Sequence, residues 1–212
     1  MLKNLSIPQE FVLLALDRET NKLKSIFRMH VAVYTVMACI VELSMNGNVT
    51  IEDDETVRIS NSAPTGVMYL DRLLDIIAAE NPKKLKQWVS YFYYNQRDIY
   101  KMVVESLVDK GVLEIENTEV LFVVPVKKYT DVANTRNHIV EKIRAELLEQ
   151  GNVEAHTVAL VVLLNVKNML NDYFSDYEQK TLKQKLEILR KEDIYKKIRT
   201  VDLALQNLDS GI

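Results

Sequence analysis

The chain has 212 residues, of which 48% are hydrophobic, and this content is ample for the packed core of one domain or of two small ones. Its 27 Lys and Arg residues against 30 Asp and Glu residues leave a formal net charge of −3. This balance excludes attraction to nucleic acid or to an anionic membrane as a property of the whole surface. Any such binding must come from a local patch.

The single cysteine and the N-terminal sequence indicate the compartment. Cys39 lies in an apolar run and cannot form an internal disulfide, so we interpret it as a small buried hydrophobe in a reducing environment. The polar first ten residues contain no apolar signal-peptide core. The longest apolar runs, 31–41 and 158–166, are shorter than the ~20 residues that span a bilayer, which favours buried helices. The sequence therefore predicts a cytoplasmic protein.

The first 47 residues are predicted to form two helices. The chain has few residues that interrupt helices, only 5 Gly and 4 Pro, and this favours long helices over an all-β fold. A capping box of Ser6 and Gln9 predicts a helix from about Ile7 to Leu16. An apolar helix is predicted from about Met29 to Met45, and Asn46-Gly47 is typical of a left-handed C-terminal cap.

A hairpin and an amphipathic helix are predicted next. Alternating residues predict the hairpin over 49–59, with the acidic run 53–55 as its solvated turn rather than a cation site. The stretch SNSAPTG, residues 60–66, has a single glycine and so cannot form a phosphate-binding loop, which needs several. We interpret it as the turn into a helix that begins near Gly66. The predicted buried residues of that helix are Met68, Leu70, Leu73, Leu74 and Ile77.

Two further helices and a hairpin are predicted between residues 82 and 128. Asn81-Pro82 is typical of an N-cap and first helical residue, and predicts a helix over 82–93 with Trp88 on its buried face. The next helix should run from about Asn95 to Lys110 and close at Gly111 in a left-handed cap. The second hairpin follows it, with Asn117-Thr118 near its turn.

The remainder, from about Ala133, is predicted to form three or four helices. No composition shift marks a linker, and we find no internal repeat. We therefore predict one domain over 6–212, after a short N-terminal tail of residues 1–5.

Motifs of catalysis are missing from the sequence. The three histidines, His30, His138 and His156, belong to no metal-ligand spacing, and no G-x-S-x-G motif occurs. We predict no metal, no cofactor and no catalytic residue. Because catalytic triads form in space rather than in sequence, this weakens an enzymatic function without excluding it.

Two segments suggest binding surfaces. Helix 95–110 followed by a hairpin has the order of a winged helix, in which a basic helix would enter a DNA groove. The helix carries Asp98, Glu105 and Asp109 beside its basic residues, so we do not expect nucleic-acid binding. The C-terminal segment 177–199 is basic and amphipathic, but its carboxylates favour a solvated helix face over a membrane-bound one. A winged-helix-like adaptor or regulator that binds nucleic acid or protein stays the alternative function.

Five stretches together resemble the Golgi phosphoprotein 3 family, whose members are peripheral membrane proteins that bind phosphatidylinositol 4-phosphate. In chain order they are LLALDRETNKLK (13–24), VELSMNGNV (41–49), SNSAPTGVMYLDRLL (60–74), NPKKLKQWVS (81–90) and ESLVDKGVLEIE (105–116). The most specific pieces are S-x-APTG-x-x-x-LD and LV-x-KGVL. The resemblance covers nearly the whole chain from Ser6 and implies a mostly α-helical single domain, in which amphipathic helices and two or so small β-hairpins wrap a central apolar helical bundle.

The family's lipid pocket, carried over residue by residue, is only partly present. The resemblance places the family's headgroup-binding tryptophan at or next to Phe27 and replaces one arginine by about Val36. A pair of arginines becomes Arg97 and Tyr100, so one cation of the set remains. Its neighbours Arg28 and Lys101 are further candidate headgroup ligands. A surface arginine paired with Asp98 or with solvent is the alternative for Arg97.

The second hairpin lies where the family places an apolar hairpin implicated in membrane contact and self-association. The residues that suit an apolar tip with a basic flank are Val123, Val124, Val126, Lys127 and Lys128. Residues 120–138 are thus the expected site of self-association, with packing on the core as the alternative. The basic extension through which eukaryotic members contact coat proteins does not precede the domain here, which suggests a prokaryotic member. The resemblance implies a non-enzymatic, cytoplasmic, peripherally membrane-associated protein.

Overall fold

Three helices with little polar surface form the centre of the computed structural model, which describes residues 4–16, 31–95, 98–120, 124–149, 151–165 and 168–209. They are α1 (Ile7–Leu14), α2 (Val31–Met45) and α7 (Ala155–Asn165). All eight residues of α1 are buried, and α7 is buried from Thr157 to Leu164. Helices that are apolar all round are stable only when other elements enclose them.

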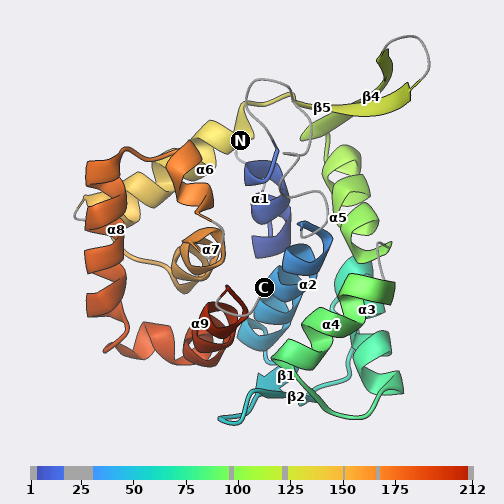
Figure 1. Ribbon diagram of the computed structural model, residues 1–212, viewed down its shortest axis with the longest axis vertical. Helices are drawn as coiled ribbons and strands as arrows, with labels where there is room; N and C mark the ends of the chain where they lie inside the picture. Colours follow the sequence, from blue (N-terminus) through green and yellow to red (C-terminus); the bar gives the residue numbers. More distant parts are fainter. Residues whose placement is uncertain are drawn as a thin grey trace.

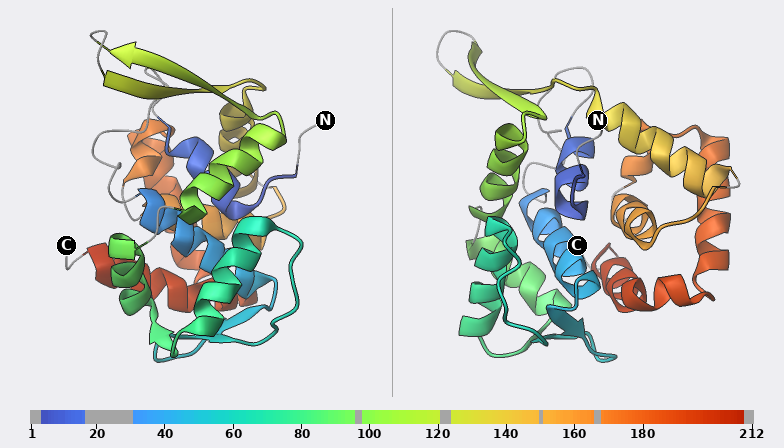
Figure 2. Two further views of the ribbon diagram at one scale, coloured as in Figure 1. Left: turned by 90° about the vertical axis from the view of Figure 1, so that its right-hand side faces the viewer. Right: turned by 180° about the vertical axis from the view of Figure 1, so that it is seen from behind.

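Amphipathic helices enclose these three on two sides (Figures 1 and 2). One side consists of α3 (Met68–Ala79), α4 (Leu85–Asn95) and α5 (Asp98–Asp109), which contact α2. The other consists of α6 (Thr135–Ile143) with the π-helical turn η2 (Arg144–Leu148), the 3₁₀ turns η3 (Met169–Asp172) and η4 (Asp193–Tyr195), α8 (Asp176–Leu189) and α9 (Lys196–Asp209). The predicted mostly α-helical domain with a central apolar bundle is confirmed.

The predicted caps of α1 and α5 are present. Ser6 Oγ accepts from the Gln9 N–H at 3.4 Å and Gln9 Oε1 accepts from the Ser6 N–H at 3.1 Å, which is the capping box. Gly111 has φ +60°, the left-handed conformation predicted for it, and its N–H donates to the carbonyl of Val108 at the end of α5. Both devices act within four residues of sequence, so local pattern suffices to predict them.

Helix α3 confirms four of its five predicted core residues. Leu70, Leu73, Leu74 and Ile77 are buried, but Met68 is 73% exposed, and the prediction for Met68 was wrong. The reason is geometric: at about 100° per residue, Met68 lies some 200° around the helix from Leu70 and so faces outward. Trp88 of α4 is fully buried, as predicted.

A small three-stranded antiparallel sheet joins α2 to α4. Its strands are β1 (Val49–Ile51), β2 (Thr56–Ile59) and β3 (Lys83–Lys84), and Val49 pairs with Ile59, which confirms the hairpin predicted over 49–59. The predicted helix start at Pro82 was wrong. Because Lys83 and Lys84 pair with β2, α4 begins only at Leu85.

The second hairpin is longer than predicted. Its strands β4 (Leu113–Val120) and β5 (Val124–Asp131) pair from Leu113–Asp131 to Val120–Val124. Asn117 pairs with Lys127 in the middle of the ladder, so the predicted turn at Asn117-Thr118 was wrong. The ladder extends to the pair Val120–Val124, and residues 121–123 lie outside the described part of the chain. The outer half of the hairpin projects beyond the helical body (Figure 2).

Candidate functional site

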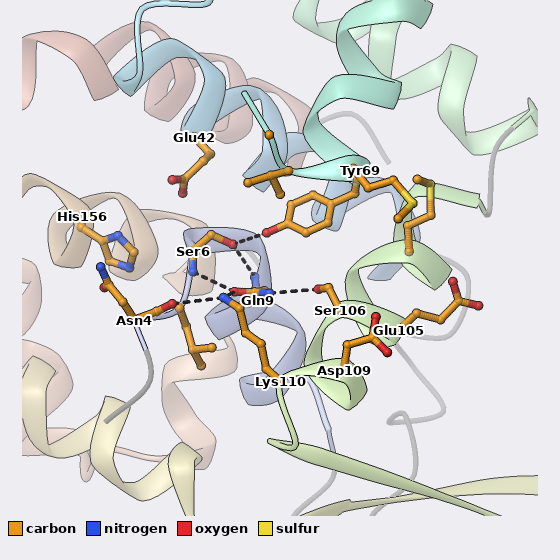
Figure 3. Close-up of a pocket in the computed structure, with 15 residues that line it drawn as sticks. Asn4, Ser6, Gln9, Glu42, Tyr69, Glu105, Ser106, Asp109, Lys110 and His156 are labelled. Carbon is orange, nitrogen blue, oxygen red and sulfur yellow. Dashed lines mark hydrogen bonds between the residues drawn. The ribbon is translucent and has the colours of Figure 1, made fainter. Parts of the chain in front are cut away.

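A pocket of about 610 Å³ lies at the N-terminal end of α1 (Figure 3). It is lined by residues from the start of the described chain, from α2, from residues 66–69 at the start of α3, from α5 beyond its first turn and from the start of α7. The two most specific stretches of the family resemblance, around SNSAPTG and LVDKGVL, both contribute to its wall through Gly66–Tyr69 and Asp109–Lys110. The fold thus brings together two motifs about 40 residues apart in sequence.

The side chain of Gln9 organises the floor of the pocket. It is only 1% exposed, and a buried amide must have hydrogen-bond partners. Its Oε1 accepts from the Ser6 N–H and, at 2.8 Å, from Lys110 Nζ, while its Nε2 donates to Ser106 Oγ at 2.9 Å. Lys110 Nζ also donates to the Asn4 carbonyl at 3.1 Å. This network fixes α1 against the end of α5 and holds the polar floor in place.

Glu42 of α2 satisfies a backbone donor at the same helix end. Its Oε2 accepts from the N–H of Ile7 at 2.9 Å, and the first N–H groups of a helix have no partner within the helix. Beside it, Ser6 Oγ and the Tyr69 hydroxyl are 2.7 Å apart. Burial raises the pKa of Tyr69, with Cys39 and Glu42 adding to the shift against the opposing effect of the Ser6 hydrogen bond, so the phenol stays neutral. Tyr69 therefore lines the pocket with a neutral hydroxyl that is hydrogen-bonded to Ser6.

His156 and Glu10 link α7 to α1 across the back of the pocket. His156 Nε2 lies 2.7 Å from Glu10 Oε2, and Glu10 is buried. Burial lowers the pKa of His156, but the hydrogen bond and charge of Glu10, with the charge of Glu42, outweigh it and raise the pKa above its ordinary value. The pair is thus an ion pair over more of the neutral pH range than an exposed histidine would allow.

The arrangement of these groups suits binding rather than acyl transfer. The hydroxyls of Ser6 and Ser106 bond to Tyr69 and Gln9, and His156 bonds to a carboxylate, so the described lining contains no serine activated by a histidine. Over the described ranges, no three His, Cys, Asp or Glu side chains form a group that could hold a metal ion.

The residues predicted to bind a lipid headgroup lie elsewhere. Phe27, Arg28 and Arg97 are outside the described residues. Lys101, on the first turn of α5, is 65% exposed at its side chain and 4.0 Å from Asp98 Oδ1. The Tyr100 side chain packs against the core, and its burial, with the neighbouring phenol of Tyr129, raises the pKa of its hydroxyl.

Most of the predicted membrane-contact residues lie on β5. Val123 lies outside the described part, and Val124, Val126 and Lys127 are placed by backbone pairing alone. Lys128 is half-buried, with its Nζ 3.7 Å from Glu116 Oε2 on β4. Because Tyr129 of β5 neighbours Tyr100, the base of the hairpin lies against the first turn of α5. The structure thus brings the predicted headgroup-binding residue Tyr100 close to the predicted membrane-contact hairpin.

Sequence reasoning missed the pocket. Gln9 was recognised only as a cap, Glu42 only as a member of the stretch VELSMNGNV, and His156 belongs to no motif. One signal was available: Gln9-Glu10 is a polar pair in the first turn of a helix whose following residues are all apolar, so one or both had to be buried with partners. Beyond Ser6, their partners come from α5, from Lys110 after it and from α7, and no sequence spacing identifies them.

No helix in the described ranges is long and apolar enough to cross a membrane. Val36, the position at which the resemblance implies a missing arginine, is fully buried in α2. The family model of Golgi phosphoprotein 3 (GPP34) matches residues 7–203, which is nearly the whole chain and includes the three central helices α1, α2 and α7. The protein therefore belongs to the Golgi phosphoprotein 3 (GPP34) family.

Proposed function

We propose that this protein is a non-enzymatic peripheral membrane protein that binds anionic phospholipid headgroups from the cytoplasmic side. The observation that carries the proposal is the family match over residues 7–203. Phosphatidylinositol 4-phosphate is the headgroup that the family resemblance implies. The ligand candidates are Arg97, Arg28 and Lys101, with Phe27 and Tyr100 as their aromatic surroundings.

The charge of the candidate site predicts weak discrimination among anionic lipids. A phosphate monoester carries up to two negative charges, and geometric selection requires several fixed donors. Val36 supplies none, and Lys101 is a flexible point charge on an exposed helix turn. We therefore expect phosphatidylinositol 4-phosphate to be preferred only slightly over other anionic lipids at equal total charge.

The hairpin is proposed as the second membrane contact. Between its last paired residues, Val120 and Val124, the sequence is the apolar Leu121-Phe122-Val123, and Lys127 and Lys128 follow. An apolar tip with a basic flank suits the boundary between lipid headgroups and acyl chains. We propose that the same segment, residues 120–138, mediates any self-association.

The alternative of nucleic-acid binding gains no support. The apolar face of α5, with Ile99, Val103 and Leu107, is buried in the core. Its exposed positions include Glu105 and Asp109, which would repel a phosphate backbone.

Vesicle flotation tests the proposed function. The purified protein would be mixed at low salt with neutral phosphatidylcholine vesicles, and with vesicles that carry phosphatidylserine or phosphatidylinositol 4-phosphate at equal charge. We expect binding to both anionic preparations and little to the neutral one, because surface electrostatics are strongest at low salt.

Two arginine variants sharpen this test. Arg97→Ala should weaken binding by about 1.5–3 kcal/mol if its hydrogen bonds to phosphate are charge-assisted. Arg58→Ala is the matched control, since Arg58 is an exposed arginine of β2 paired with Glu52, at the opposite end of the molecule from the β4–β5 hairpin (Figure 1). Equal losses in the two variants, or binding that is independent of anionic lipid, would refute the proposal.

A further inference from the structure

The pocket at the N-terminal end of α1 shares no lining residue with the candidate lipid-site residues that the structure describes. On α5 its lining runs from Met102 to Asp109, whereas Tyr100 and Lys101, on the first turn of the same helix, are not part of it. Its volume of about 610 Å³ is within the range of small-molecule sites, about 300–1,000 Å³. The polar floor around Gln9 is fixed by hydrogen bonds to Ser6, Ser106 and Lys110, so the cavity is formed without a ligand.

The lining combines a polar floor with an apolar wall. Val67, Met68 and Met102 supply the wall, and Met68 exposes 73% of its surface at the rim although it is a large apolar residue. Methionine side chains adapt to ligands of irregular shape because they are unbranched and polarizable. The wall therefore suits a short aliphatic chain.

The charges of the pocket favour a cation. Glu42, Glu105 and Asp109 line it, and in the described ranges Glu105 and Asp109 form no ion pair. Glu105 and Asp109 lie one turn apart on α5, an arrangement in which like charges repel. The Lys110 ammonium donates to the Gln9 side-chain oxygen and to the Asn4 carbonyl. His156 is directed to Glu10.

We propose that this pocket binds a small organic cation, an aliphatic amine or guanidine whose chain packs on Val67, Met68 and Met102 and whose charged end is held by Glu105 and Asp109. The fixed floor supplies the hydrogen-bonding partners for any second polar end. This proposal does not rest on lipid binding, so either proposal can fail alone.

Titration calorimetry at low salt tests this proposal on the full chain, with 1,5-diaminopentane as the probe. We expect saturable one-site binding, and no heat of binding from 1,5-pentanediol, which has the same chain without charge. The double variant Glu105→Gln, Asp109→Asn should weaken binding at least about tenfold, or ~1.4 kcal/mol. Both residues are exposed, so the variant should fold.

The matched control is Glu192→Gln, which removes an exposed carboxylate before η4, outside the pocket lining, and should leave the affinity unchanged. Methyl NMR spectra should place the perturbations at Met68 and Met102. Equal binding of the diol, equal weakening in the control, or perturbed methyls away from this pocket would overturn the proposal. So would binding of a lysine-containing peptide without binding of the free amine, since that result indicates a protein partner.

Discussion

The side chains of Leu73 and Met68 face opposite ways on α3, and they provide a direct test of the core. Leu73 is fully buried, whereas Met68 is 73% exposed. Leu73→Ala should reduce the free energy of unfolding by ~2–5 kcal/mol, because it removes buried methyl groups and leaves a cavity. Met68→Ala should change it by less than about 0.5 kcal/mol. Urea titration measures both, and a loss below about 1 kcal/mol for Leu73→Ala would mean that α3 does not face the core.

His156 should make stability depend on pH near neutrality. Its pKa is raised in the folded state by Glu10 and Glu42 against burial and the charge of Lys142. A raised folded pKa contributes stability that is fully present below the unfolded value of about 6.5 and is lost as pH rises through the folded value. The stability difference between the native chain and His156→Gln should therefore shrink as pH is raised from about 6 to 8.5.

Chemical denaturation at several pH values measures this difference. Glu10→Gln is the informative companion variant, because it removes the main group that raises the pKa and should flatten the profile. A difference between native chain and His156→Gln that stays constant over the range, or that grows with pH, would contradict the assignment.

The junction of η2 and α8 depends on one carboxylate. Glu178 closes the capping box of α8 with Ser175, and its Oε1 accepts from Arg144 Nε of η2 at 2.7 Å. The hydrogen bond from Arg144, with those from the backbone and side chain of Ser175, lowers the pKa of Glu178 to about 2. A lowered folded pKa contributes stability above the unfolded pKa that is lost as pH falls.

Glu178→Gln should therefore lower Tm at pH 7 and should flatten the acid side of the Tm profile between about pH 4.5 and 2. Scanning calorimetry over that range measures both effects. Glu141→Gln is the control, since Glu141 also pairs with Arg144 but has a 67% exposed side chain, and exposed pairs contribute little. An unchanged slope in Glu178→Gln would show that the junction is held by other contacts.

The arrangement of the whole molecule predicts that the hairpin can be shortened without unfolding the bundle. Glu116 and Lys128 are paired in register, and the pairs beyond them lead into the half that projects from the helices (Figure 2). Replacing residues 117–127 by Asn-Gly, a two-residue hairpin turn, should change Tm by only a few degrees, because the core residues Leu113 and Tyr129 remain.

The same shortened chain should lose much of its flotation with anionic vesicles, since the apolar tip is removed. Circular dichroism establishes that the helical content is kept before binding is measured. Undiminished vesicle binding by a folded shortened chain would exclude the hairpin as a membrane contact and would leave the helical body to carry it.

Features that depend on near neighbours in the chain were predictable. The capping box of Ser6 and Gln9, the left-handed Gly111 and the hairpin over 49–59 each arise from residues a few positions apart. The enclosed helices α2 and α7 were also predictable, because an apolar run too short for a membrane must be buried. For features set by residues close together in the sequence, hydrophobic periodicity and helix caps are enough for a prediction.

Features that depend on distant partners were decided only by the tertiary structure. The hydrogen bond from Lys110 to Gln9 joins residues 101 apart in sequence, and the pair of His156 and Glu10 joins residues 146 apart. Lys83-Lys84 became a strand because β2 offered an open edge, and Asn117 became mid-strand because the ladder continues past it. Sequence alone determines which groups must be buried, but packing selects their partners, because many distant polar groups are chemically equivalent candidates until the chain is folded.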